Sequence, residues 1–122
     1  MIPYENNLNR QVAEKIMGWY LSNLHAGTQN TLGTVSWCKD EIDIIKWADW
    51  NPLEDLNQCF QIVERLRENH CCITIYSDGN YCWRIELIDV DSKTHKPYVI
   101  IDGEENLNEA ILRASLKTLE RP

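Results

Sequence analysis

Near the end of the chain, three charged residues stand at helical spacing, and the two cations among them could bind an anionic group. Glu109, Arg113 and Lys117 occupy positions i, i+4 and i+8 in the stretch NEAILRASLK, residues 108–117. One interpretation is a surface ladder of ion pairs, each worth about 0.3–0.5 kcal/mol. The other is a cation site in which the planar guanidinium fork of Arg113, with Lys117 beside it, binds a phosphate. The residues alone leave both interpretations open.

A second candidate cation, Arg84, lies within a stretch that has the periodicity of a strand. In YCWRIELIDV, residues 81–90, Arg84 alternates with the apolar Trp83 and therefore points to the opposite face. Arg84 either pairs with a glutamate across the sheet or lines a pocket between the sheet and a partner subunit. Tyr76 and Tyr98, like Trp83, lie on strands expected near Arg84, where an aromatic ring could stack on a flat ligand.

His70, Cys71 and Cys72 have the residue types of a zinc site but not its spacing. Adjacent strand residues point to opposite faces, so both cysteines cannot bind one ion without distortion. The sequence has no Cys-x-x-Cys or His-x-x-x-His pair, no P-loop, no dinucleotide fingerprint and no nucleophile elbow. We therefore expect buried strand cysteines, no metal, no cofactor and no catalytic residue. A Cys–His nucleophile pair stays open, without a motif to support it.

Composition limits the partners that these residues can have. The formal net charge of −7 over 122 residues repels polymeric nucleic acid, whereas a small anion needs only two or three well-placed cations. Apolar runs reach four residues at most, far below the ~20 that span a bilayer, and the N-terminus lacks the basic and apolar order of a signal peptide. Five cysteines are an odd number, which favours reduced thiols. We expect one intracellular domain, residues 1–122, that binds no membrane.

Hydrophobic spacing predicts three helices to position the charged residues. Apolar residues recur every three or four positions over residues 7–24, 51–68 and 107–119. Asn51 is the expected N-cap of the second helix, with Pro52 at its first position, and Asn106 is the candidate N-cap of the third.

Strand periodicity over residues 71–76, 81–90 and 97–101 predicts a meander, because SDGN at 77–80 is a strong hairpin signal. TVSWC, residues 34–38, is a further short strand. The expected fold class is α+β, with an antiparallel meander sheet packed with three α-helices. Trp83, Ile85 and Leu87 should face the helices.

Four stretches, in this order, resemble the phage ABA-sandwich domain family over nearly the whole chain. They are VAEKIMGWY, WADWNPLEDLNQCFQIVERLRE, YCWRIEL and NEAILRASLKTL. The shared motifs are Met17-Gly18-Trp19, Trp50-Asn51-Pro52 with Asp55, and Ala110-Ile111 through Ala114 and Leu116.

The resemblance implies a function as well as a fold. Some members of the family are anti-defence proteins of phages and prophages, the first-described type of Thoeris anti-defence protein. These proteins bind the cyclic ADP-ribose signal made by bacterial TIR-domain enzymes and withhold it from its effector without degrading it. They act as homo-oligomers that hold the nucleotide at a subunit interface. By resemblance, this chain is expected to be such a sponge in the host bacterial cytoplasm, and not an enzyme.

On this hypothesis the cations meet the pyrophosphate and the aromatic rings meet the base. The expected ligand-binding residues are Arg113, Lys117, Arg84, Trp83, Tyr98, Tyr76 and Glu109. Cyclic oligonucleotides are left open as a second ligand class. Two alternatives also stay open: a hydrolase of cyclic nucleotide signals, and a phage protein-interaction module without a small ligand.

Overall fold

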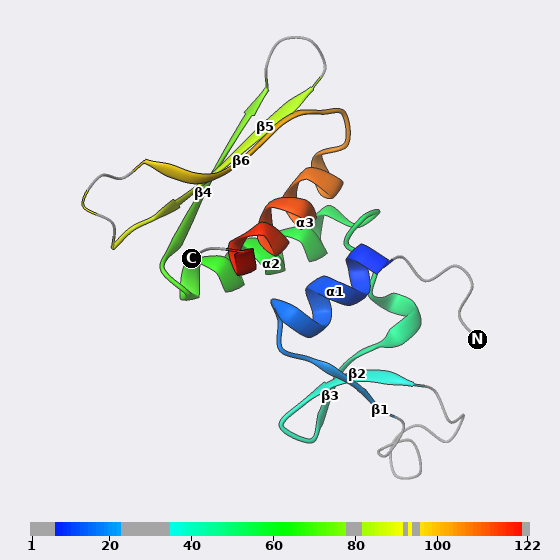
Figure 1. Cartoon of the computed structure of the whole chain (residues 1–122). Helices are drawn as coiled ribbons and strands as arrows, with labels where there is room; N and C mark the ends of the chain where they lie inside the picture. The colour runs from blue at the N-terminus through cyan, green and yellow to red at the C-terminus, as the bar shows by residue number, and fades with distance from the viewer. Residues whose placement is uncertain (1–6, 23–34, 78–81, 92, 94–95, 121–122) are drawn as a thin grey trace.

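A computed structural model of the chain describes residues 7–22, 35–77, 82–91, 93 and 96–120. Helices lie between two three-stranded antiparallel sheets (Figure 1). The helices are α1 (Asn7–Lys15), α2 (Leu56–Glu68) and α3 (Leu107–Lys117), with short 3-10 turns at Trp47–Asp49 and Thr118–Glu120. The first sheet contains β1 (Tyr20–Ser22), β2 (Ser36–Lys39) and β3 (Ile42–Lys46), and the second contains β4 (Cys71–Ser77), β5 (Trp83–Asp89) and β6 (Pro97–Glu104). The α+β class is confirmed.

The first helix is shorter than its periodicity predicts, and the strand β1 follows it within the predicted range. α1 ends at Lys15, and Gly18 turns the chain into β1 with a φ of 75°, a conformation that glycine adopts without steric cost. Tyr20 and Leu21 continue the helical spacing but pair with β2. The first sheet was therefore not predicted, apart from the short strand now seen as β2. Gly27, the expected helix stop, lies outside the described residues.

The second helix begins four residues later than predicted. Asp55, and not Asn51, is its N-cap, because Asp55 Oδ1 accepts a hydrogen bond from the Gln58 amide at 3.2 Å. The amides of Glu54 and Asp55 both donate to the Asn51 carbonyl at 3.0 Å, so residues 51–55 form a separate turn. The helix end at Glu68 is confirmed.

Hydrogen bonds from α1 anchor the segment before α2. Trp50 Nε1 donates to the Asn9 carbonyl at 2.9 Å, and the Asn9 side chain donates to Asn51 Oδ1 at 2.9 Å. The Trp50 ring also meets the edge of Trp19, with ring centroids 4.8 Å apart. These contacts fix the segment that leads into α2 against α1.

The second sheet is the predicted meander, and its inner face packs on α2 and α3. Ile85 and Leu87 are fully buried on that face, as predicted, while Trp83 at the strand end is half-buried. Asn106 is confirmed as the N-cap of α3, since its side chain accepts from the Glu109 amide at 2.9 Å. Among the described residues, no helix is long and apolar enough to cross a membrane.

Candidate functional site

The exposed face of α3 carries the charged ladder, opposite a fully apolar or small buried face. Arg113 is 50% exposed, and its Nη2 atom lies 3.4 Å from Glu109 Oε1. Lys117 Nζ lies 3.9 Å from Glu120 Oε2, an even longer separation. The buried side of the helix consists of Ala110, Ile111, Leu112, Ala114 and Ser115. Arg113 and Lys117 therefore both lie at the surface of the helix, and the ion pair of each is long.

A second carboxyl group lies beside Arg113 where β6 leads into α3. Burial, and after it the neighbouring Glu109 carboxyl, raises the pKa of Glu104, while Arg113 acts in the opposite direction. Trp83 stands opposite Glu104 in the register of β5 and β6. The structure thus brings Trp83, Glu109 and Arg113 to one corner of the molecule, together with Glu104 at the end of β6.

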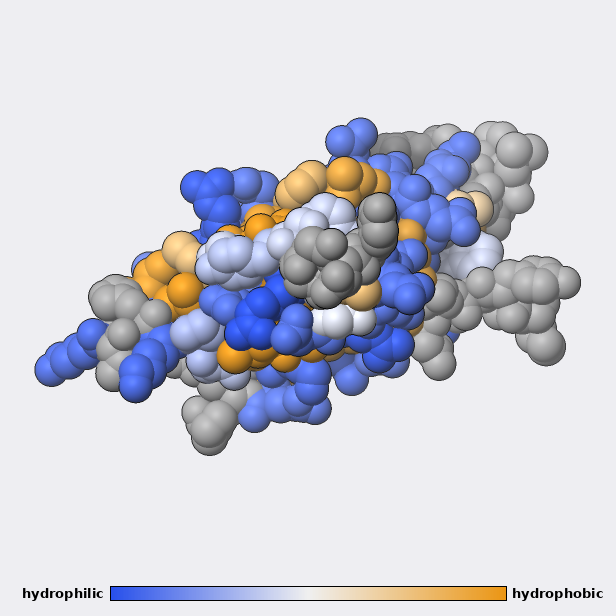
Figure 2. Space-filling model, turned by 90° about the horizontal axis from the view of Figure 1, so that it is seen from above, coloured by the Kyte–Doolittle hydropathy of each residue, from blue (hydrophilic) through white to orange (hydrophobic). Residues whose placement is uncertain are grey.

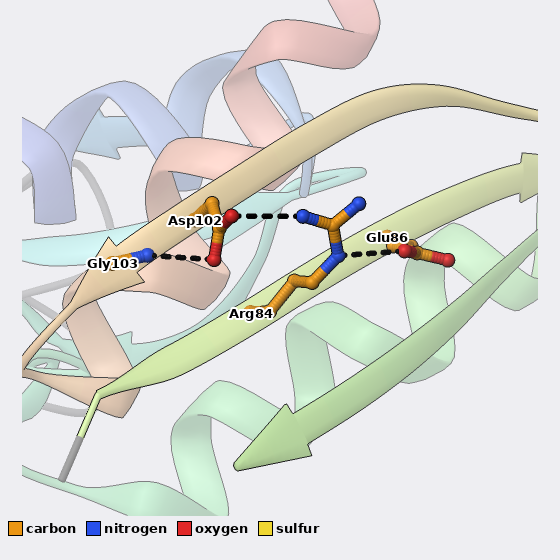
Figure 3. Close-up of polar contacts among 4 residues, drawn as sticks. All are labelled: Arg84, Glu86, Asp102 and Gly103. Carbon is orange, nitrogen blue, oxygen red and sulfur yellow. Dashed lines mark hydrogen bonds and ion pairs between the residues drawn. The ribbon is translucent and has the colours of Figure 1, made fainter. Parts of the chain in front are cut away.

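Arg84 is held by two carboxylates on the outer face of the second sheet (Figure 3). Its Nε atom lies 2.8 Å from Glu86 Oε2, and its Nη1 atom lies 2.9 Å from Asp102 Oδ2. The other oxygen of Asp102 accepts from the Gly103 amide at 3.0 Å (Figure 3). The expected cross-strand glutamate is thus wrong in detail, since Glu86 is on the same strand and the cross-strand partner is Asp102. An incoming phosphate would have to displace a carboxylate here.

We use the term outer face for the side of the second sheet that points away from α2 and α3. Tyr76 lies directly across from Arg84 on this face and is half exposed, as is Ile100 on β6. Seen from above Figure 1, the surface of the molecule shows apolar residues scattered among hydrophilic ones (Figure 2). Among the described residues, the outer face therefore offers the ring of Tyr76 beside a guanidinium group that is already paired.

Tyr98 does not join Tyr76 and Arg84. A bulge in β6 leaves Tyr98 as an extra residue, because Leu87 pairs with Val99 while Ile88 pairs with Pro97. The Tyr98 hydroxyl instead donates to Cys71 Sγ at 3.2 Å. Tyr98 lines a hollow of about 210 Å³ together with Ile16, Leu66, Asn69, Thr118, Leu119 and Lys15. Lys15 is a cation that was not among the predicted site residues.

The five cysteines form no disulfide, and the two with shifted acidity are poor nucleophiles. Burial, aided by a hydrogen bond to Asp43 at 3.2 Å, raises the pKa of Cys38 to about 11. Burial and the charge of Asp55 raise the pKa of Cys59 to about 12. Both thiols are protonated at neutral pH, whereas catalysis needs the thiolate.

The adjacent Cys71 and Cys72 point to opposite faces, as the strand geometry predicts. Cys71 is buried, but Cys72 is exposed, so the expectation of a buried cysteine is wrong at that position. Within the described ranges, no group of three or more His, Cys, Asp or Glu side chains could hold a metal ion.

The motifs that carried the resemblance lie in the core and at helix starts. Ala110, Ile111 and Ala114 are buried on α3, Trp19 and Trp50 pack together, and Asp55 caps α2. The profile of the phage ABA sandwich domain family matches residues 10–116. The chain belongs to this family. Comparison with curated proteins and with solved structures gives no match. In this member of the phage ABA sandwich family, the shared motifs lie where they maintain the fold.

Proposed function

We propose that this protein is a phage or prophage anti-defence protein that binds and sequesters a cyclic ADP-ribose signal. The ligand is glycocyclic ADP-ribose made by TIR-domain proteins, and withholding it in the host cytoplasm blocks Thoeris immunity. The chain belongs to the phage ABA sandwich family. This membership supports the proposal, because the resemblance described above implies that some members are sponges of this kind. The protein acts by binding alone, without a cofactor.

The loosely tied Arg113 on α3 is the single observation that favours an anion site most. A pyrophosphate needs a cation that can turn toward it, and the 3.4 Å contact of Arg113 with Glu109 is easily exchanged for a shorter, charge-assisted bond. Lys117, one turn further along the same exposed face, adds a second cation. Trp83 at the same corner offers an aromatic surface for a base.

A sponge must bind tightly enough to outcompete a receptor, which favours a site closed by two copies. Nanomolar affinity corresponds to about −12 kcal/mol, and sites of that quality bury most of the ligand in about 300–1,000 Å³. The hollow beside Tyr98 measures about 210 Å³, so it cannot enclose such a nucleotide by itself. The exposed corner around Arg113 likewise could cover only one side of a bound nucleotide. A homo-oligomer that places this corner against a second copy supplies the missing wall.

The experiment that tests the proposal is recovery of the ligand after binding. The protein is incubated with glycocyclic ADP-ribose, the complex is isolated and heated, and the released nucleotide is identified by mass spectrometry. The proposal predicts stoichiometric recovery of the intact molecule. Recovery of a cleaved product would instead establish the hydrolase.

A thermal-shift panel separates the sponge from a protein-interaction module. A ligand at 100 times its dissociation constant adds about 2.7 kcal/mol to the free energy of unfolding. The panel contains glycocyclic ADP-ribose, other cyclic ADP-ribose isomers and cyclic oligonucleotides. Stabilisation by the first compound is expected, and a melting temperature that ignores every nucleotide would favour the interaction module.

A further inference from the structure

The edge of the first sheet exposes apolar residues that the proposed ligand site does not use. β3 is the last strand in the order β1-β2-β3, so the described part of the chain places no strand on its outer side (Figure 1). Ile42 is 62% exposed and Ile44 is 47% exposed. Ile44 is also the extra residue of a bulge, because Asp43 pairs with Cys38 and Ile45 with Trp37. An exposed apolar edge strand is a ready surface for association with another chain.

Charges of opposite sign stand at the two ends of β3. Asp40 and Glu41 form the turn that precedes the strand, and Lys46 is its last residue. In the part of the chain that the structure describes, none of these three side chains makes an ion pair. Exposed charges on α2, by contrast, are paired locally, as in Arg67 with Glu64 at 2.7 Å and Arg65 with Glu68 at 3.0 Å. The two ends of β3 thus carry charged side chains that have no ion-pair partner within the described part of the chain.

The acidic turn adopts a backbone conformation that favours other residues. Asp40 and Glu41 have φ values of 52° and 66°, in the left-handed region that glycine occupies most easily. Two-residue hairpin turns of this type prefer Asn-Gly or Asp-Gly. The Glu41 amide is held by a hydrogen bond to the Tyr20 hydroxyl at 3.2 Å. The turn geometry therefore does not explain why residue 41 is a glutamate. We look for the reason in its negative charge.

We propose that the β3 edge is a self-association surface whose occupant is β3 of a second copy in antiparallel orientation. With a two-fold axis near Ile44, that residue packs on its own copy, and Ile42 lies beside the aliphatic stem of the partner's Lys46. The ammonium group of Lys46 then reaches the Asp40–Glu41 turn of the other chain. The symmetry repeats both contacts, so the two apolar residues and both sets of charges are satisfied together.

This inference concerns the partner of the chain and not its ligand. It does not rest on the proposed function, because β3 belongs to the first sheet and the Arg113 corner to α3, and it is tested in the absence of nucleotide. Failure of self-association through β3 and failure of nucleotide binding are therefore separate results.

The test is the mass of the protein in solution, measured by light scattering and sedimentation for the wild type and three variants. The wild type should have at least twice the chain mass of 14.3 kDa. Ile44→Lys should reduce the assembly to a smaller species, and Lys46→Glu should weaken association at least tenfold. Adding Asp40→Lys and Glu41→Lys to Lys46→Glu should restore association, because the charges of both ends are then exchanged.

Ile100→Lys is the matched control, because Ile100 is also 47% exposed but lies on the outer face of the second sheet. It should leave the mass unchanged, and unchanged circular dichroism of each variant shows that the fold is retained. A monomeric wild type overturns the proposal. So does an Ile44→Lys variant that keeps the mass of the wild type, or a charge exchange that fails to restore association.

Discussion

Two arginines of this protein were equal candidates by residue type, but their surroundings differ. Arg84 donates to Glu86 at 2.8 Å and to Asp102 at 2.9 Å, so two carboxylates already hold both sides of its guanidinium group. Arg113 lies on a helix surface with one contact of 3.4 Å. A charge that is fully paired mainly organises its own neighbourhood, whereas a loosely paired charge can be drawn to a ligand. Under the proposed function we therefore expect the ligand at Arg113, and a structural role for Arg84.

The largest expected effect concerns the buried face of α3, directly next to Arg113. Leu112 is fully buried, so Leu112→Ala should lower the free energy of unfolding by about 2–5 kcal/mol. Denaturant unfolding monitored by tryptophan fluorescence measures this change. Arg113→Ala, one residue away, should leave the midpoint nearly unchanged. A large loss of stability in Arg113→Ala would mean that this arginine supports the fold, which breaks the comparison.

The next effect separates the two arginines by releasing each from a carboxylate. Glu109→Gln keeps the size of the side chain but removes the charge that competes with a phosphate for Arg113. Nucleotide affinity should rise about threefold, the scale of one exposed ion pair. Asp102→Asn similarly releases one side of Arg84 and should not change the affinity. Calorimetric titration of both variants measures the affinities. A gain in nucleotide affinity in Asp102→Asn alone would show that the phosphate binds at Arg84 and not at Arg113.

The smallest effect is a pH dependence at the Arg113 corner. Burial and Glu109 raise the pKa of Glu104 in the folded state, so the folded protein holds this proton more strongly than the unfolded chain. The stability from this group is present below the unfolded-state pKa of about 4.3 and is lost as the pH rises through the folded-state pKa. Glu104→Gln should therefore be more stable than the wild type at pH 7, with a difference that vanishes below about pH 4.

Thermal unfolding across this pH range measures the difference between Glu104→Gln and the wild type. Glu86→Gln is the counterpart on the sheet. It removes a partner of Arg84, so at pH 7 it should lower stability instead. If both variants changed the stability at pH 7 in the same direction, the environments of the two carboxylates would be alike, contrary to this comparison.

Locally determined parts of the fold were predictable from the sequence. The start of α3 follows from the cap at Asn106 and the apolar spacing after it, and the faces of β5 follow from strict alternation around Ile85 and Leu87. The end of α1 was not predictable in this way, because Tyr20 and Leu21 keep the helical spacing. Only the φ of Gly18 and pairing with a strand that begins at Ser36 make them a strand.

The site residues were harder to place, because their positions depend on register. The bulge in β6 removes Tyr98 from the face of Tyr76, and no local pattern signals it. The cross-strand partner of Arg84 is Asp102, 18 residues away and just beyond the strand predicted over residues 97–101. The i, i+4 ladder around Arg113 was predictable because helix geometry alone brings those side chains together. Chemistry set by one helix could be read from the sequence, but chemistry set by sheet register could not.

The most direct test of the assignment is a calorimetric titration of glycocyclic ADP-ribose into Arg113→Ala and Arg84→Ala. Arg67→Ala is the control, since Arg67 is an exposed helix arginine paired with Glu64 on α2. Removing a charge that binds a ligand phosphate typically costs 2 kcal/mol or more, about 30-fold in affinity. We expect a loss of at least that size in Arg113→Ala, and affinities within about threefold of wild type in the other two, since exposed ion pairs contribute little. Full affinity in Arg113→Ala, or an equal loss in Arg84→Ala, would contradict the account.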